Sequence, residues 1–139
     1  MGDFVATHRI THEATTSMLA AGIARANELG ALVCIAVVDS GGELQAFVRM
    51  DGARFFSARA TIKKAVTSAS QRMPSGYFDK AGEVSMQIRM DGDFTNIPGG
   101  FPIFVDGQVI GGVAAGGAKI EHDVEVAKAA LGAIGMVPV

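Results

Sequence analysis

Charged side chains that could bind a ligand or transfer a proton lie where the chain is expected to change direction. Asp39 follows an apolar run over residues 33–38, and Arg49 and Asp51 end the segment that follows the pair Gly41 and Gly42. An apolar run suits a strand that is buried on both faces, and paired glycines suit the tight turn of a hairpin. We therefore expect the three charges at the edges of a hairpin, where polar groups remain accessible to a ligand.

Two further charges, Lys64 and Asp123, lie on helical faces that otherwise carry small or apolar groups. Lys64 shares one side of an expected helix over residues 53–72 with small residues, and this side either admits a ligand or another subunit or faces water. Asp123 projects into the apolar arc of an expected helix over residues 119–135. A carboxylate in that position needs partners. One explanation is structural, that the free N–H groups of the first helical turn stabilise the carboxylate. The other is that Asp123 belongs to a binding site near Gly116 and Gly117, where a ligand could approach the backbone.

The three histidines are candidates for iron binding or proton transfer. His8 and His12 have the i, i+4 spacing of a helical metal site, but they straddle the expected start of a helix, so the pair is weak support for zinc. His122 stands beside Asp123 and is a candidate for moving a proton. For each histidine an ordinary surface or capping role is the alternative, although haem iron needs only one axial nitrogen.

The elements that must position these residues follow from periodicity and turn signals. A helix is expected over residues 11–29, with Thr11 as its cap and Gly30 as its end. The helix over residues 53–72 should bury the side that carries Phe55, Ile62 and Ala65. Residues 74–100 are expected to form a long ordered loop. A second hairpin turns at residues 106–107, and the resulting order of elements predicts an α+β fold with an antiparallel sheet flanked by helices.

Composition limits the class of protein. The chain has 139 residues, 49% of them hydrophobic, which suits a single domain over residues 1–139. A net charge of −2 without a basic run argues against nucleic-acid binding. No apolar run is long enough to cross a membrane and no signal segment is visible, so we expect a cytoplasmic protein. The single Cys34 is expected to be a small core residue.

Two blocks of the sequence carry a family resemblance. The first is the pattern VVDxGGxLxAFxRMDGA from residue 37, followed by a helix that contains Lys64 and Ala65. The second covers residues 98–117, which include Asp106 and Gly107, and is followed by Glu121, His122 and Asp123. In order and spacing both blocks resemble the GlcG/HbpS-like (haem-degrading, DUF336) family. The resemblance covers most of the chain and implies a profilin-like or PAS-like three-layer domain.

The resemblance also implies a function, that of a small oligomeric protein that binds haem noncovalently and, by the family's description, degrades it. It implies an axial ligand such as His12 and a cation such as Arg49 or Lys64 near the propionates, because charge-assisted hydrogen bonds would fix those carboxylates. The expected partners are haem or another small molecule and further copies of the chain. A different interpretation is an accessory or sensory module, in which the surface between subunits matters more than any reaction.

The alternative is a cofactor-independent isomerase, lyase or hydratase that acts on a small carboxylated metabolite. Arg49 or Lys64 would then anchor the carboxylate, and the backbone of Gly116 and Gly117 would stabilise negative charge. Asp39, Asp123 or His122 would move the proton.

Overall fold

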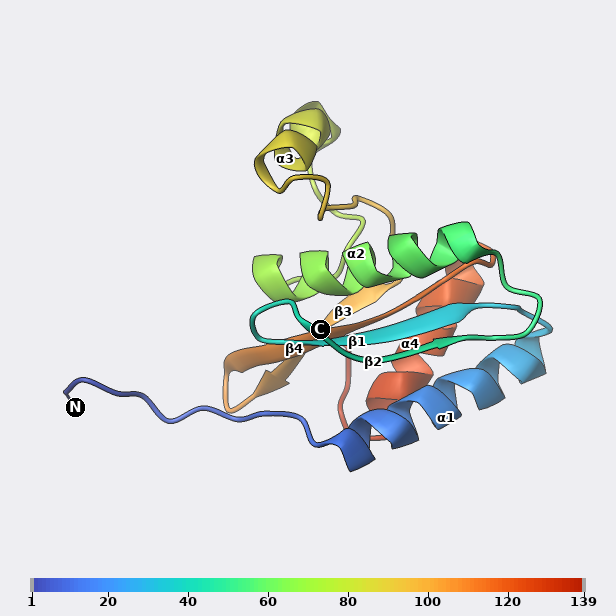
Figure 1. Ribbon diagram of the computed structural model, residues 1–139, viewed down its shortest axis with the longest axis horizontal. Helices are drawn as coiled ribbons and strands as arrows, with labels where there is room; N and C mark the ends of the chain where they lie inside the picture. Colours follow the sequence, from blue (N-terminus) through green and yellow to red (C-terminus); the bar gives the residue numbers. More distant parts are fainter. Residues whose placement is uncertain (1, 139) are drawn as a thin grey trace.

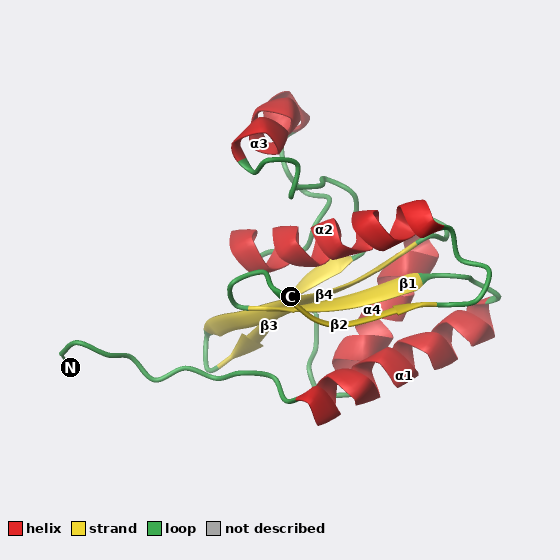
Figure 2. Ribbon diagram, in the orientation of Figure 1, coloured by secondary structure: helices red, strands yellow, loops and turns green. Residues whose placement is uncertain are grey.

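The computed structural model describes residues 2–138, which form a three-layer α+β domain (Figure 1). The central layer is a four-stranded antiparallel sheet with the order β2-β1-β4-β3. Helix α2 covers one face of the sheet, and α1 and α4 cover the other (Figure 2). The elements are α1 His12–Leu29, β1 Cys34–Asp39, β2 Leu44–Arg49, α2 Phe55–Gln71, the 3-10 helix η1 Lys80–Gly82, α3 Glu83–Arg89, β3 Gly100–Val105, β4 Gln108–Gly116 and α4 Ile120–Gly132. The fold class expected from the sequence is confirmed.

Helix α1 begins and ends where local signals predict. The Thr11 side chain accepts a hydrogen bond from the N–H of Ala14 at 3.1 Å, which satisfies one of the free donors of the first turn. Gly30 adopts a φ of 67°, a left-handed conformation that suits glycine and ends the helix. The buried side of α1 includes Met18 and Ala26, which belong to the core shared by α1, α4 and the sheet.

Both hairpins form where the sequence predicts, with one difference at the first turn. There Gly42 alone has a positive φ, 81°, and Gly41 does not, so one glycine meets the conformational need. The Asp39 carboxylate accepts hydrogen bonds from the N–H groups of Gly41 and Glu43, which gives it a part in the turn itself. In the second hairpin Asp106 and Gly107 both have positive φ, as a tight two-residue turn requires.

The buried side of α2 agrees only in part with the expected one, because Ala65 is buried as predicted but Phe55 is not. Phe55 is 78% exposed, whereas Thr61, Lys64 and Ser68 face the sheet and are buried. The reason is close packing on the small-residue side, because a Cβ on Gly116 would lie 2.5 Å from Thr61 Oγ1. The side with small residues therefore admits the chain's own glycine-containing strands rather than a ligand.

The segment over residues 74–100 is not a continuous loop, since it contains η1 and the seven-residue α3. In Figure 1 α3 stands clear of α2 and the sheet. Its aromatic residues divide, because Phe94 is buried and Tyr77 is 70% exposed. The helix was missed because seven residues span about two turns, too few for a periodic pattern.

Strand β1 lies in the middle of the core, and Cys34 is a buried free thiol on it, as expected. Burial raises the pKa of this thiol, and the charge of Arg49 acts in the opposite direction. None of the helices found in residues 2–138 combines the length and apolar character that a bilayer crossing requires.

Candidate functional site

Lys64 and Asp123 meet between the sheet, α2 and α4. The Lys64 Nζ donates to Asp123 Oδ2 at 3.1 Å and to the carbonyl oxygen of Ala115 at 3.0 Å. Asp123 Oδ1 accepts a hydrogen bond from the N–H of Ala118 at 3.0 Å. Both charged side chains are 4% exposed. Each charge therefore has a partner, so the pair links the layers on the two faces of the sheet.

The pKa of Asp123 reflects this burial. Loss of solvent raises the pKa of the carboxyl above its ordinary value of 3.8, while the charge of Lys64 and the N–H of Ala118 act in the opposite direction. The N–H donor belongs to Ala118, which precedes α4 rather than lying in its first turn, and the second partner is the buried cation of Lys64.

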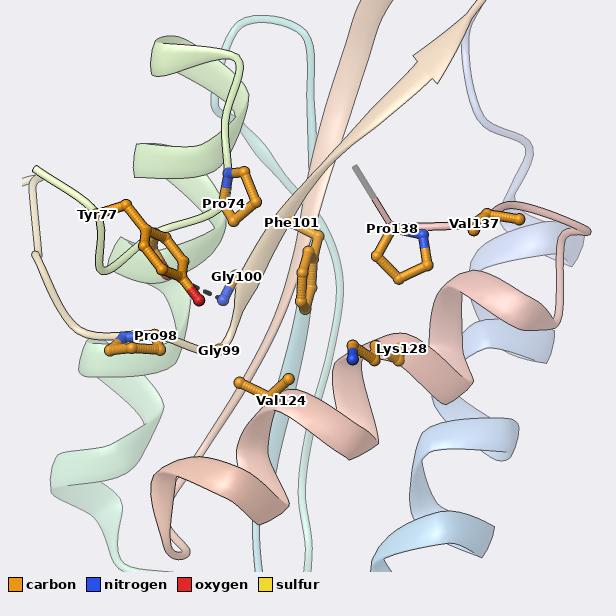
Figure 3. A pocket seen from close by; sticks show the side chains of 11 residues that line it. Pro74, Tyr77, Pro98, Gly99, Gly100, Phe101, Val124, Lys128, Val137 and Pro138 are labelled. Atoms are coloured by element: carbon orange, nitrogen blue, oxygen red, sulfur yellow. Dashed lines mark hydrogen bonds between the residues drawn. The ribbon is translucent and has the colours of Figure 1, made fainter.

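A pocket opens next to this ion pair, with a volume of about 470 Å³. Figure 3 shows Tyr77 and Pro98 on the side of α2, Val124 and Lys128 on α4, and Phe101 between them. The walls are mainly apolar, and Tyr77 and Lys128 are the ionisable residues among the described lining residues. The pocket therefore suits an apolar molecule that carries an anionic group.

Gly99 separates the pocket from the ion pair. It lines the pocket and has a φ of 127°. A Cβ at this residue would lie 2.9 Å from Lys64 Nζ and 2.8 Å from the carbonyl oxygen of Ala115. Only glycine fits this place without displacing the ion pair or the backbone.

Arg49 does not take part in the ion pair, although its strand ends at the same end of the sheet. Arg49 pairs with Cys34 in the β-sheet register, and Cys34 pairs with Gly116 on its other side. The Arg49 side chain instead lines a separate pocket with Asp51 and Leu32. Of the two cations considered as anchors for a ligand carboxylate, Lys64 therefore meets Asp123 and Arg49 lies in a different pocket.

His122 and Gly117 line a third pocket, which has a volume of about 550 Å³ and also includes Arg54 and Lys119. Gly117 has a φ of 117°, and a Cβ there would lie 3.0 Å from the carbonyl oxygen of Leu32 and 3.2 Å from Ser57 Oγ. Gly116 instead packs on α2, because a Cβ there would lie 2.5 Å from Thr61 Oγ1. The two glycines therefore do not act together at one binding site.

His12 and Asp39 lie at the opposite end of β1, in a pocket of about 670 Å³. Arg9, Ile10 and Gln45 also line it. Gln45 Nε2 donates to the carbonyl oxygen of Ile10, but Gln45 Oε1 is buried and has no hydrogen-bond partner among residues 2–138. An unpaired buried acceptor calls for a donor from a bound water or ligand.

Sequence reasoning missed Arg9 and Gln45, because neither stands in a motif. Their roles follow from the pairing of β2 with β1, which brings Gln45 beside the segment before α1. Of the two histidines considered as a metal pair, His12 lines this pocket, and His8 Nε2 lies 3.8 Å from Asp106 Oδ2. Within residues 2–138 no group of three His, Cys, Asp or Glu side chains is arranged to hold a metal ion.

The arrangement defines a class, a three-layer α+β domain with small pockets at both ends of its sheet. A family model described as "Haem degrading protein HbpS-like" matches residues 10–132, and the chain belongs to this family. The resemblance recognised in the sequence is confirmed.

Relatives support the same assignment. Protein GlcG of Escherichia coli strain K12 is 33% identical over 105 residues, which are 75% of this chain and 78% of GlcG. The corrinoid adenosyltransferase PduO of Citrobacter freundii is 29% identical over 119 residues, which are 82% of this chain. The match covers only 36% of PduO, so the chain corresponds to about a third of that relative.

Solved structures share the fold. The protein ORFY of Klebsiella pneumoniae is 27% identical with a TM-score of 0.91, and the match covers 99% of this chain and 98% of the ORFY chain. HbpS is 26% identical with a TM-score of 0.85, and the match covers 98% of this chain and 97% of HbpS. A haem complex of PduOC is 23% identical with a TM-score of 0.84 and covers 92% of this chain and 96% of its own, a likeness that establishes the fold alone.

Proposed function

We propose that this protein binds haem noncovalently. The proposal is supported by membership of a family described as haem-degrading and by a structural relative, PduOC, that was solved as a haem complex. The chain has one cysteine and no CxxCH attachment motif, so a covalent haem link of that type is not expected. Self-association of the chain is part of the same proposal.

The observation that carries the proposal is the pocket that His12 and Arg9 share. An imidazole is a common axial ligand of haem iron, and a guanidinium is well suited to a propionate carboxylate. The pocket volume of about 670 Å³ lies within the range of roughly 300–1,000 Å³ that is usual for small-molecule sites. His12 and Arg9 would hold the haem there, and the iron would supply the coordination and redox chemistry.

The fit is partial, since Ile10 is the main apolar side chain in a largely polar lining. A porphyrin therefore needs apolar cover from outside this pocket. Phe4 and Val5 are 91% and 86% exposed on the segment just before Arg9, and they are our candidates for this cover. Lys64 is not a candidate for a propionate contact, because it is buried in the pair with Asp123.

The test is a titration with ferric haem that follows the Soret band. We expect a saturable shift with the unchanged chain. His12→Ala should weaken binding at least about tenfold, since even outer-shell partners of a metal ligand typically contribute 10–100-fold. His122→Ala is the matched control, because His122 lines another pocket with Arg54 and Lys119, and it should bind as the unchanged chain does. Loss of binding in His122→Ala but not in His12→Ala would contradict the proposed site.

A metabolite enzyme of the isomerase, lyase or hydratase type is not favoured. It needs a carboxylate anchor and a proton carrier that a substrate can reach. Lys64 and Asp123, which would have served, are 4% exposed and bonded to each other. Asp39, the other acid considered for this role, is engaged by two backbone N–H groups in its own turn.

A further inference from the structure

The segment over residues 77–97, here called the arm, is an ordered structure that projects from the body. Asn96 bonds to both the N–H and the carbonyl oxygen of Phe78, each at 2.9 Å. The rings of Phe78 and Phe94 pack edge to face with centroids 5.1 Å apart. At its base the arm is tied to α2, where the N–H of Thr95 donates to Thr67 Oγ1 at 3.0 Å. The arm thus has its own internal support.

The helix on this arm presents an apolar face to solvent. Val84 and Ile88 are 71% and 72% exposed, and their i, i+4 spacing puts them on the same side of α3. A helix of seven residues is marginal in water without tertiary packing. Figure 1 shows α3 standing away from the helices and strands of the body. Its apolar face therefore lacks a partner within the described chain.

A matching surface lies at the start of α2. Phe55 and Phe56 are 78% and 71% exposed there, beside the exposed Arg54 and Arg59. Residues 54–72 include no acidic residue. The arm has four acidic residues and two basic ones, so its charge is opposite to that of α2. Both surfaces combine exposed apolar groups with complementary charge.

The two surfaces do not meet within one chain. The arm is anchored at Thr67, twelve residues after Phe55, which on a helix corresponds to roughly 18 Å. We propose that the arm of one copy packs on the start of α2 in a second copy, with Val84 and Ile88 against Phe55 and Phe56. Because each copy carries both surfaces, a two-fold arrangement makes the contact twice. The inference specifies the surface for the self-association proposed above and does not depend on haem.

Sedimentation equilibrium of the unliganded protein tests this contact. Ile88→Asp and the double variant Phe55→Asp/Phe56→Asp should each raise the dissociation constant of the assembly by roughly 30-fold or more, as a central contact residue does. All three side chains are exposed, so the fold should be retained, which far-ultraviolet circular dichroism checks. Val137→Asp is the matched control, since Val137 is 83% exposed and outside both surfaces, and it should associate as the unchanged chain does.

Mixing the two kinds of variant gives the sharper result. In a two-fold pair of one Ile88→Asp chain with one Phe55→Asp/Phe56→Asp chain, both lesions fall in the same contact and the other contact is intact. The mixture should therefore associate more tightly than either variant alone. A monomeric unchanged chain, variants that associate normally, or a mixture without recovery would each overturn the proposal. Ferric haem titration of Ile88→Asp is scored separately, so failure of haem binding does not affect this test.

Discussion

Removal of one partner from the buried Lys64–Asp123 pair should destabilise the fold, whereas removal of both should cost much less than the two single changes together. In Lys64→Met the carboxylate of Asp123 loses its cation in a site where both side chains are 4% exposed. Breaking such a pair typically costs 3–5 kcal/mol. We expect about 3 kcal/mol, the lower end, because burial already raises the pKa of Asp123 and the group can take up a proton.

Asp123→Asn should cost about 2 kcal/mol. The amide oxygen of Asn keeps an acceptor for the N–H of Ala118, and Lys64 keeps its bond to the carbonyl oxygen of Ala115. In the double variant no buried charge remains, so we expect about 2 kcal/mol in total. The coupling between the two residues is then about 3 kcal/mol.

Urea unfolding at neutral pH, followed by circular dichroism, measures these free energies, with m-values that should stay constant. Lys63→Met is the matched control, because Lys63 is the neighbouring lysine on α2 and is partly exposed, and it should change stability by no more than about 0.5 kcal/mol. If the two single changes add in the double variant to within about 0.5 kcal/mol, the ion pair does not stabilise the fold as described.

Three further predictions concern single residues. Because the pKa of Asp123 is raised, the folded state binds its proton more tightly, so this stabilisation is present below pH 3.8 and is lost as the pH rises through the raised pKa. The free energy of unfolding of the unchanged chain, relative to that of Asp123→Asn, should therefore fall as the pH rises through this range, and an increase with rising pH would contradict the assignment. Cys34 should react with a thiol reagent slowly in the native chain and quickly in guanidinium, since it is buried and the pKa of its thiol is raised; equal rates would show that the strand is open. Gly99→Ala should destabilise by about 3 kcal/mol in thermal unfolding, because of its φ of 127° and its close contacts, whereas Gly132→Ala, with open space around it, should be neutral or slightly stabilising. Equal effects of the two glycine variants would contradict the packing described at Gly99.

Local signals in the sequence were sufficient for most of the fold. Thr11 and Gly30 mark the ends of α1 because capping and left-handed conformations depend on the residue itself. The turn at Asp106 and Gly107 is specified in the same way. The buried side of α2 was predicted only in part, for Ala65 is buried but Phe55 is exposed, because large apolar residues usually mark the core. Here glycines on the sheet favour the side with Thr61 and Ser68 instead.

The candidate sites were only partly predictable. Asp123 could be singled out because a carboxylate within an apolar arc needs partners, and Lys64, 59 positions away, is the partner that the fold supplies. The position of Arg49 in the sequence did not indicate that it would line a different pocket, because that depends on the direction of its side chain at the edge of the sheet. Gln45 was missed because its position near His12 depends on tertiary structure, whereas Arg9, three residues before His12, was missed because it stands in no motif.

The central claim is that an imidazole of this chain binds the iron of haem. The most direct measurement compares binding of ferric haem with binding of metal-free protoporphyrin by isothermal titration calorimetry, in the unchanged chain and in His12→Ala. We predict that the unchanged chain binds haem more tightly than the metal-free porphyrin and that His12→Ala loses this difference. Equal affinities of the unchanged chain for the two porphyrins, or no saturable binding of haem, would contradict the account.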